Sequence, residues 1–548
     1  GAATSSDSNF SSINPADVTV TNTDDDTAGF TISSISDNTT ELGDNATFTV
    51  LLNSQPSANV TIGVSSSDTG EGTVSPSSLT FTNSNWSTAQ TVTVTGVDDN
   101  TTDGNQNYTV VLAAASSSDS NYNNLNPSDV SLSNIHNDWK GIKQLGSSQD
   151  DHATGMVIDA NGNVYIGGST WGGLDGNTNA GSRASGDIIL IKYNSSGIKQ
   201  WTKQTGTGVY SNETDFVYGV DIDSDANIYL AGVTEGDLDG ITNSGSYDIF
   251  LMKYNSSGTK QWTKLTGNSY INYTAGVALD PNSNNIYVTG VNQGTLDGQA
   301  NSGENDIFLI KYDSSGTKQW TRQTGSSSAD SGRGIGVDSF GNIYVAGLTH
   351  GGLDGYTNLG GGTDAFIMKY NSSGTKQWTK QFGTSSSEQS WALTVDSSDN
   401  IYVIGATYGG LDGNTNAGGI DFFLVKYNSS GTKQWTKQLG TSVTDEGLGL
   451  TTDYNGNIFV TGLTYGGLDG NSSSGGADAF LVKYNSSGDK QWTKQFGTSA
   501  DDIGWTVEVG GDGYLYLSGY THGGFDNNTN AGSSDIFVVR LNSNGIIQ

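Results

Sequence analysis

The sequence predicts an all-β protein in which a β-sandwich precedes a seven-bladed β-propeller. The phrase DFFLVKYNSSGTKQW at residues 421–435 returns almost unchanged around five other tryptophans, Trp201, Trp262, Trp320, Trp378 and Trp492. Glycine is abundant (77 residues), proline is rare (5), and no stretch shows the apolar period of a helix. A repeat of this length built only of strands has no core of its own, so its copies must stack on one another.

Each copy of this phrase predicts a β-hairpin. An apolar strand at residues 422–427 meets the turn Asn428-Ser-Ser-Gly431, and the return strand carries Trp435. Gly431 provides the positive φ that the turn needs where the return strand begins. One full repeat supplies four expected strands, at residues 447–452, 457–463, 478–484 and 490–495. The first of these is small and glycine-rich, which suits the crowded inner edge of a blade.

The number of repeats predicts a closed ring. The inner strand occurs seven times, ending at Asp159, Asp223, Asp280, Asp338, Asp396, Asp453 and Val509. Only six complete outer strands follow these inner strands. The segment WKGIKQL at residues 139–145 matches the missing outer strand with two extra residues. We therefore expect this N-terminal strand to pair with the last blade, because closure removes exposed sheet edges.

Residues 27–138 predict an antiparallel β-sandwich. Period-two runs separated by turn residues occupy residues 30–35, 46–52, 60–64, 79–82, 91–97, 108–113 and 130–135. Residues 1–26 resemble the end of this module, with Asn14 matching Asn126. We expect them to be the tail of a preceding copy, with a closing strand at residues 18–21. That strand is disordered, belongs to an upstream module, or completes a sandwich on another subunit.

Two parts of the chain resemble known families. Residues 1–138, with TVSPSSLTFTNSNWSTAQTVTVTGVDDN at 73–100, are similar to the Calx-beta-like, immunoglobulin-like modules of bacterial surface proteins. Residues 139–548, with VDSSDNIYVIGATYGG at 395–410 and DIFLIKYDSSGTKQW at 306–320, resemble the SBBP family of bacterial seven-bladed propellers. Both resemblances imply export and an extracellular, cell-surface location.

The first resemblance also implies acidic junctions between modules that hold structural Ca²⁺. The matching residues here are Asp24, Asp25, Asp26 and Glu41, with Asp98, Asp99 and Asp103 as further partners.

The charge of the chain restricts its partners. The formal net charge is −33, and residues 1–138 contain no Lys or Arg. Nucleic acid is excluded because phosphate binding needs basic patches, and anionic membrane surfaces are disfavoured by the same repulsion. No apolar run is long enough to insert into a membrane, and cysteine is absent. Ca²⁺ would relieve the repulsion, although solubility explains the acidity equally well.

The loop LDGNTNAGGID at residues 411–421 is a candidate calcium site. Its oxygen donors alternate in the manner of a calcium loop, although the bidentate Glu at position twelve is missing. The donors are Asp412, Asn414, Asn416 and Asp421, and in the last repeat Asp526, Asn528, Asn530 and Asp535. The alternative is an Asx-turn loop, in which these side chains bond to their own backbone.

A single variable position in the repeated phrase T-x-G-G is a candidate ligand-binding rim. Around the ring this position holds Trp171, Glu235, Gln293, His350, Tyr408, Tyr465 and His522. It is expected on the same face as the long loops. Aromatic and polar groups on a rim suit sugars or a peptide. The alternative is that these side chains only cover the Gly-Gly bend.

Nothing in the sequence predicts catalysis. The four histidines are scattered, and there is no HExxH motif, nucleophile elbow or phosphate loop. The leading hypothesis is a non-enzymatic, extracellular structural or adhesive surface protein, a filament or stalk subunit that displays a propeller head. It would contact other copies of itself or other surface and matrix proteins. The second hypothesis is a lectin-like, glycan-binding propeller, and the third is a secreted polysaccharide-processing enzyme.

Overall fold

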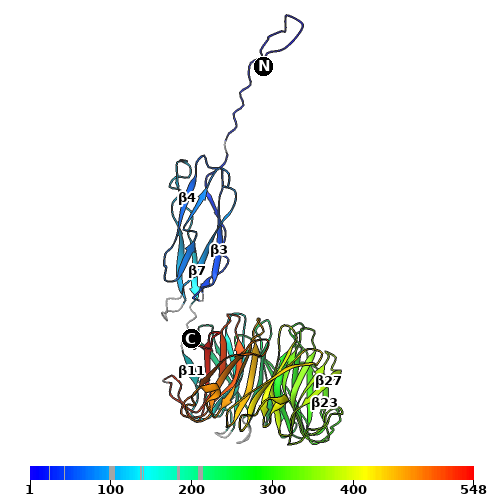
Figure 1. Cartoon of the computed structure of the whole chain (residues 1–548). Helices are drawn as coiled ribbons and strands as arrows, with labels where there is room; N and C mark the ends of the chain where they lie inside the picture. The colour runs from blue at the N-terminus through cyan, green and yellow to red at the C-terminus, as the bar shows by residue number, and fades with distance from the viewer. Residues whose placement is uncertain are drawn as a thin grey trace. The chain divides into compact units, whose positions relative to one another are not determined.

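The computed structural model describes residues 1–23, 25–41, 43–97, 105–135, 139, 141–181, 185–207, 214–526 and 528–548. The chain divides into two compact units, Gly1–Asp138 and Trp139–Gln548. Apart from two short 3₁₀ turns, η1 (Leu411–Gly413) and η2 (Leu468–Gly470), every regular element in the described residues is a strand (Figure 1). Over the same residues, no helix has the length and apolar character needed to cross a bilayer.

The first unit contains two sheets around one core. One sheet has the order β1 (Phe30–Ile32), β3 (Asn45–Leu52), β7 (Gln90–Gly96), β5 (Gly72–Ser75). The other has the order β2 (Thr39–Thr40), β10 (Val130–Ile135), β8 (Gln106–Leu112), β4 (Val60–Ser66), β6 (Ser78–Phe81), with β9 (Ser116–Ser117) also on β4. Alternate residues of each long strand point inward, and Phe48, Phe81 and Val92 are among the fully buried ones.

Strands lie at all seven of the positions expected in this unit, and three short strands were missed. The missed strands β2 and β9 have two residues each, and β5 has four. The two-residue strands are too short to display a period of two, so the sequence pattern carries no signal for them. β5 was missed although it is as long as β6, which was expected.

The strand expected at residues 18–21 is absent from the single chain. Among the described residues no strand precedes Phe30, and Val18 and Val20 are 87% and 84% exposed. A lone strand has no stability without sheet partners, and this segment lacks the rest of a sandwich. Pairing of residues 1–26 with another copy of the chain stays a prediction.

The second unit consists of repeated four-stranded antiparallel sheets. The inner strands are β12 (Asp151–Ile158), β16 (Asp215–Ile222), β20 (Asn272–Leu279), β24 (Asp330–Val337), β28 (Glu388–Val395), β32 (Asp445–Thr452) and β36 (Asp502–Val509). The second strands are β13 (Val164–Thr170), β17 (Ile228–Thr234), β21 (Ile286–Asn292), β25 (Ile343–Thr349), β29 (Ile401–Thr407), β33 (Ile458–Thr464) and β37 (Leu515–Thr521).

The third strands are β14 (Asp187–Tyr193), β18 (Asp248–Tyr254), β22 (Asp306–Tyr312), β26 (Asp364–Tyr370), β30 (Asp421–Tyr427), β34 (Asp478–Tyr484) and β38 (Asp535–Leu541). The outer strands are β15 (Lys199–Thr205), β19 (Lys260–Thr266), β23 (Lys318–Thr324), β27 (Lys376–Phe382), β31 (Lys433–Leu439), β35 (Lys490–Phe496) and β11 (Ile142–Leu145). In the last sheet, β11 pairs antiparallel with β38.

The sheets stack because their central strands are apolar on both faces. The second and third strands are buried along almost their whole length. Each hydrophobic cluster joins residues of two successive sheets, as where Leu251 of one sheet shares a cluster with Phe308 of the next. The first and last sheets share such a cluster too, which includes Ile189 and Val538.

A tryptophan on each outer strand packs against an aromatic ring of the second strand. Tyr402 and Trp435 are one such pair, with ring centroids 6.1 Å apart. In the last sheet, Trp139 lies 5.5 Å from Tyr516 and is fully buried. Each tryptophan also packs against a glycine of the following sheet. A Cβ on Gly197 would lie 2.8 Å from Trp139, so only glycine fits there.

Removing the Trp139 side chain should destabilise the second unit. We expect Trp139→Ala to lower the free energy of unfolding by about 3–5 kcal/mol, because it leaves a cavity between Tyr193 and Tyr516. Urea unfolding followed by circular dichroism measures this change. Ile198→Ala, at a 57% exposed neighbour of Gly197, is the control and should stay within about 0.5 kcal/mol of the original chain. Equal effects of the two substitutions would contradict the packing role of Trp139.

Candidate functional site

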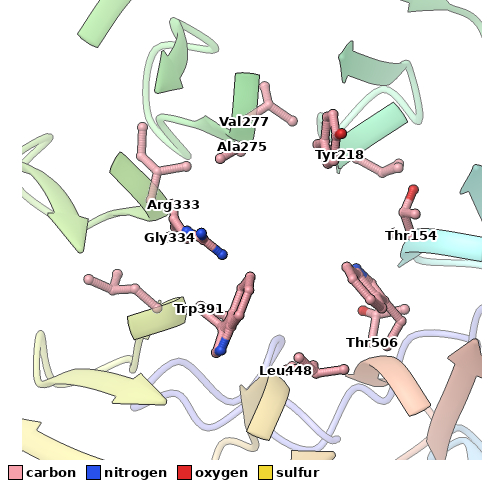
Figure 2. A pocket seen from close by; sticks show the side chains of 18 of the residues that line it. Thr154, Tyr218, Ala275, Val277, Arg333, Gly334, Trp391, Leu448 and Thr506 are labelled. Atoms are coloured by element: carbon pink, nitrogen blue, oxygen red, sulfur yellow. The ribbon is translucent and has the colours of Figure 1, made fainter. Parts of the chain in front are cut away.

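One side chain of each inner strand lines a common cavity, called the axial cavity below. In every inner strand the pairing register shifts around its fourth residue, which is left unpaired as a β-bulge. A bulge re-aims the side chain that it carries. The bulged residues are Thr154, Tyr218, Ala275, Arg333, Trp391, Leu448 and Trp505. All seven line one cavity of about 520 Å³, and Figure 2 shows six of them labelled around the same space.

Small residues after the bulge allow the inner strands to approach one another. A Cβ on Gly219 would lie 2.8 Å from the backbone nitrogen of Val277, and one on Gly334 would lie 2.6 Å from that of Leu393. These distances are shorter than side-chain atoms tolerate, so the close packing around the axis depends on glycine.

Arg333 supplies a positive charge inside the cavity. Its guanidinium carbon lies 3.9 Å from the ring centroid of Trp391, close enough for a cation–π interaction. Within the described part of the chain, no hydrogen-bond acceptor or ion-pair partner is found for this guanidinium. Burial lowers the pKa of Arg333 to about 10, while the charges of Tyr218 and Glu446 raise it. The side chain therefore remains cationic at neutral pH with its N–H donors unused.

Aromatic rings and hydroxyl groups form the rest of the wall. Tyr218, Tyr273 and Trp505 are half-buried at the cavity surface. Thr154, Ser331 and Thr506 add hydroxyl groups to the same lining. Flat apolar faces with a few polar groups are the usual composition of a small-ligand site.

Aliphatic side chains separate this cavity from a second one of about 420 Å³ along the same axis. This aliphatic collar, whose members line both cavities, consists of Val220, Val277, Ile335, Leu393 and Leu450.

Two carboxylic acids line the second cavity. Burial raises the pKa of Glu508 to about 8, the charge of Asp221 raises it further, and a hydrogen bond from Thr451 opposes the shift. Burial raises the pKa of Asp221 to about 6, against hydrogen bonds from the backbone N–H groups of Ile222 and Leu279. Both groups face a narrow channel instead of bulk water. At pH 7 Glu508 is therefore mostly protonated and adds little negative charge.

The candidate calcium loops are bonded internally as Asx turns. Asn416 Oδ1 accepts from the backbone N–H of Gly418 at 2.8 Å, and Asn414 Nδ2 donates to the Leu411 carbonyl at 2.7 Å. Buried Asp421 accepts from the Ala417 N–H and from the Gln438 side chain, each at 2.9 Å. In the last repeat, Asn528, Asn530 and Asp535 make the corresponding bonds to Phe525, Gly532 and Ala531.

Asp412 is held by a lysine of the outer strand. Lys433 Nζ lies 2.7 Å and 2.6 Å from its two carboxylate oxygens, and Thr436 donates to the second of these. Burial alone would raise the pKa of Asp412, but the bonds from Lys433 and Thr436 hold it below the usual range. The equivalent aspartates of five other repeats pair with lysines in the same way. A carboxylate used in this way does not fit a cation, so the loop geometry favours the Asx-turn alternative.

The calcium junction of the first unit stays a prediction. Asp24, Asp98, Asp99 and Asp103 lie outside the described residues. Asp25 and Asp26 are exposed and Glu41 is 6% exposed. Across the described ranges, no group of three or more His, Cys, Asp or Glu residues is arranged to hold a metal ion.

None of the T-x-G-G positions lines the cavity, and the rim that they were expected to form stays a prediction. Tyr408 and Tyr465 are about half exposed, and His350 and Gln293 are exposed. Glu235 accepts a hydrogen bond from the Thr214 N–H at 2.8 Å.

Two rim residues lie together around His152. The His152 ring is 5.3 Å from Trp171 and stacks on Tyr520 at 4.0 Å, while Tyr520 lies 5.9 Å from His522. Burial lowers the pKa of His152 to about 4, although the charge of Asp150 raises it. His152 is therefore neutral at pH 7, which suits an aromatic cluster. This cluster is the only part of the rim for which the described residues show contacts between rings.

The sequence analysis did not select the cavity residues, although their position varies strongly between the repeats. The fourth residue of the inner strand is one of its most variable positions, together with the second residue, and reads T, Y, A, R, W, L and W around the unit. The same reasoning that selected the T-x-G-G position would have selected this one. Only the bulge, which a sequence pattern does not show, reveals that these side chains share one space.

The second unit is thus an array of four-stranded antiparallel sheets consistent with a β-propeller. Its inner strands line one cavity whose composition is that of a small-ligand site. The model of the SBBP beta-propeller repeat matches residues 140–175, 200–239, 319–354, 377–412 and 434–469. The chain therefore contains SBBP repeats in five regions.

Two curated proteins are similar to this chain. Regulatory protein FlaEY of Caulobacter vibrioides is 24% identical over 305 residues, which is 48% of this chain and 29% of that protein. The uncharacterized WD repeat-containing protein L264 of Acanthamoeba polyphaga mimivirus is 25% identical over 409 residues, 56% of this chain and 29% of that protein. The chain spans less than a third of the length of either relative.

Solved structures with some likeness include a puromycin hydrolase mutant and an apocarotenoid oxygenase mutant of Synechocystis. The first has a TM-score of 0.43 and 12% identity, covering 73% of this chain and 53% of the other. The second has a TM-score of 0.39 and 11% identity, covering 73% and 92%. Likenesses at this level carry no argument about activity.

The lysine contact of Asp412 can be separated from calcium binding. We expect Asp412→Asn and Lys433→Met each to lower the free energy of unfolding by about 0.2–1 kcal/mol in the presence of a chelator. The double variant should lose less stability than the sum of the losses of the two single variants, because the two residues form one pair. Thermal unfolding with EDTA and with millimolar Ca²⁺ measures both effects. If Asp412→Asn loses stability only when Ca²⁺ is present, the loop binds calcium and the Asx-turn interpretation is wrong.

Glu508 should make the stability of the second unit depend on pH. Its folded pKa of about 8 lies above the usual value for glutamate, so the folded state binds the proton more tightly. The resulting stability is complete below about pH 4 and is lost as the pH rises to 8. We expect the melting temperature to fall between pH 5 and 8, and Glu508→Gln to flatten this fall. Exposed Glu304→Gln removes the same charge and should leave the slope unchanged; equal slopes in all three proteins would contradict the assignment.

Proposed function

We propose that the second unit is a closed seven-bladed propeller and that the first is an immunoglobulin-like, Calx-beta-like module. Seven four-stranded sheets occur within the described residues of the second unit, and β12 of the first of these sheets contacts β36 of the last. The pairing of β11 with β38 and the packing of Trp139 on Tyr516 support the same closure. Two sheets around one core support the module.

We further propose that the protein is a non-enzymatic, extracellular adhesive protein whose axial cavity holds its ligand. The observation that carries this proposal is the Arg333 guanidinium, stacked on Trp391 without an acceptor of its own. A half-buried cation in a cavity, with no acceptor found among the described residues, has N–H donors available to a ligand that supplies acceptors. The extracellular location rests on the resemblance to exported bacterial surface proteins.

A lectin-like function is the second candidate, and the aromatic wall of the cavity favours it over the exposed rim. Trp391, Trp505 and Tyr218 line one cavity, whereas Tyr408 and Tyr465 are half exposed and do not line it. A cavity removes more of a ligand's surface from water than a separate exposed ring does.

The third hypothesis, a polysaccharide-processing enzyme, is weaker. Its acids would have to be Asp221 and Glu508, and of these only Glu508 also lines the cavity of Arg333 and Trp391, so the two acids do not share that cavity.

A binding screen with two matched variants tests the proposed site. The full chain should bind at least one member of an array of glycans and matrix proteins. Trp391→Ala should weaken that binding at least tenfold, because it removes the ring that supports Arg333 and faces the cavity. Tyr408→Ala, on the rim, should leave the affinity unchanged. The reverse result would move the site to the rim, and binding that neither variant affects would overturn the proposal for the cavity.

A further inference from the structure

We infer that the axial cavity recognises a sugar ring that carries a carboxylate, at the end of an acidic saccharide. This inference deepens the proposed binding function and rests on it. It draws on three properties of the cavity: the geometry of Arg333, the charge of the lining, and the aromatic rings and hydroxyl groups of the wall.

The geometry of Arg333 fits a carboxylate. The Trp391 ring lies 3.9 Å from the guanidinium carbon and covers one face of the group. Stacking uses none of the N–H donors, which lie in the guanidinium plane, and it fixes the direction of that plane. In Figure 2 the nitrogen atoms of Arg333 lie at the edge of the open space. A fixed planar fork with free N–H groups binds a carboxylate through two parallel hydrogen bonds.

The charge of the lining selects a single negative charge. Among the described residues that line the cavity, Arg333 is the one cation and Glu508 the only acid, and Glu508 is mostly neutral at pH 7. Glu446 lies close enough to interact with Arg333, and the whole chain carries a net charge of −33. A phosphate or a polyanion carries more than one negative charge, and Arg333 can neutralise only one of them in these negatively charged surroundings. A carboxylate with a single charge is therefore favoured over both.

The wall suits a sugar ring. A sugar presents flat C–H faces and hydroxyl edges, which match aromatic rings and hydroxyl side chains respectively. Tyr218, Tyr273 and Trp505 supply the rings. Thr506 supplies a hydroxyl group that can donate and accept, and the Thr154 hydroxyl, which donates to the Val217 carbonyl, can accept. The cavity of about 520 Å³ is of the size that small ligands occupy. The aliphatic collar lies between this cavity and the second one, and we place the end of the saccharide against it.

The inference is tested by comparing an acid with its own ester on the full chain. Calorimetric titration uses a disaccharide that ends in glucuronate, its methyl ester, and the matching disaccharide that ends in glucose. We expect the acid to bind about 10- to 100-fold more tightly than the other two, the range for losing a hydrogen bond to a charged group. Arg333→Gln should remove this preference, and Arg333→Lys should restore part of it, since lysine keeps the charge without the fork.

The outcomes separate the ligand class from the proposed function. If the acid, the ester and the neutral sugar bind equally and Trp391→Ala abolishes this binding, recognition of a carboxylate is wrong. The proposed binding function is then still supported. Binding of an acidic peptide but of no saccharide, dependent on Arg333, would overturn the sugar. If no saccharide, peptide or matrix protein binds, the proposed function fails together with the inference. The acid and ester comparison needs no variant, so a poorly folded Arg333→Gln protein does not prevent the test.

Discussion

The structure of the second unit depends on one constraint: its sheets are apolar on both faces, so none is stable alone. The second and third strands are buried along nearly their whole length, and each hydrophobic cluster joins two successive sheets. Every sheet therefore needs a neighbour on each side, and the first and last sheets supply neighbours for each other through Trp139 and its surroundings. Stability is a sum over these interfaces, as in other repeat proteins.

This constraint explains which residues repeat and which vary. Residues that make the interfaces must be the same in every copy, such as the tryptophan of the outer strand and the glycine that faces it across the interface. The bulged residue of the inner strand has no partner in its own ladder and points away from both interfaces. It is therefore free to differ between copies. Arg333, Trp391 and Leu448 occupy equivalent positions, so the fold tolerates very different chemistry there.

Much of the fold could be predicted because the repeat makes each strand visible several times. The expected strand at residues 478–484 coincides with β34, and the strand at 457–463 is one residue from β33. The lysine partner of Asp412 was not predicted, because Lys433 lies 21 residues away on a different strand. The oxygen spacing of a calcium loop and that of an Asx turn are alike in sequence. Only the donors that approach from elsewhere distinguish the two.

The placement of charge bears on the selectivity of the proposed ligand site. An anionic ligand that approaches a chain of net charge −33 is repelled at long range, and salt screens this repulsion beyond about 8 Å at physiological ionic strength. Inside the cavity, the contact with Arg333 is partly removed from water and is screened much less. Repulsion outside and attraction inside mean that negative charge alone is not sufficient for binding. A ligand must also fit the space beside Trp391, where the one favourable charge is reached, so shape and charge are selected together.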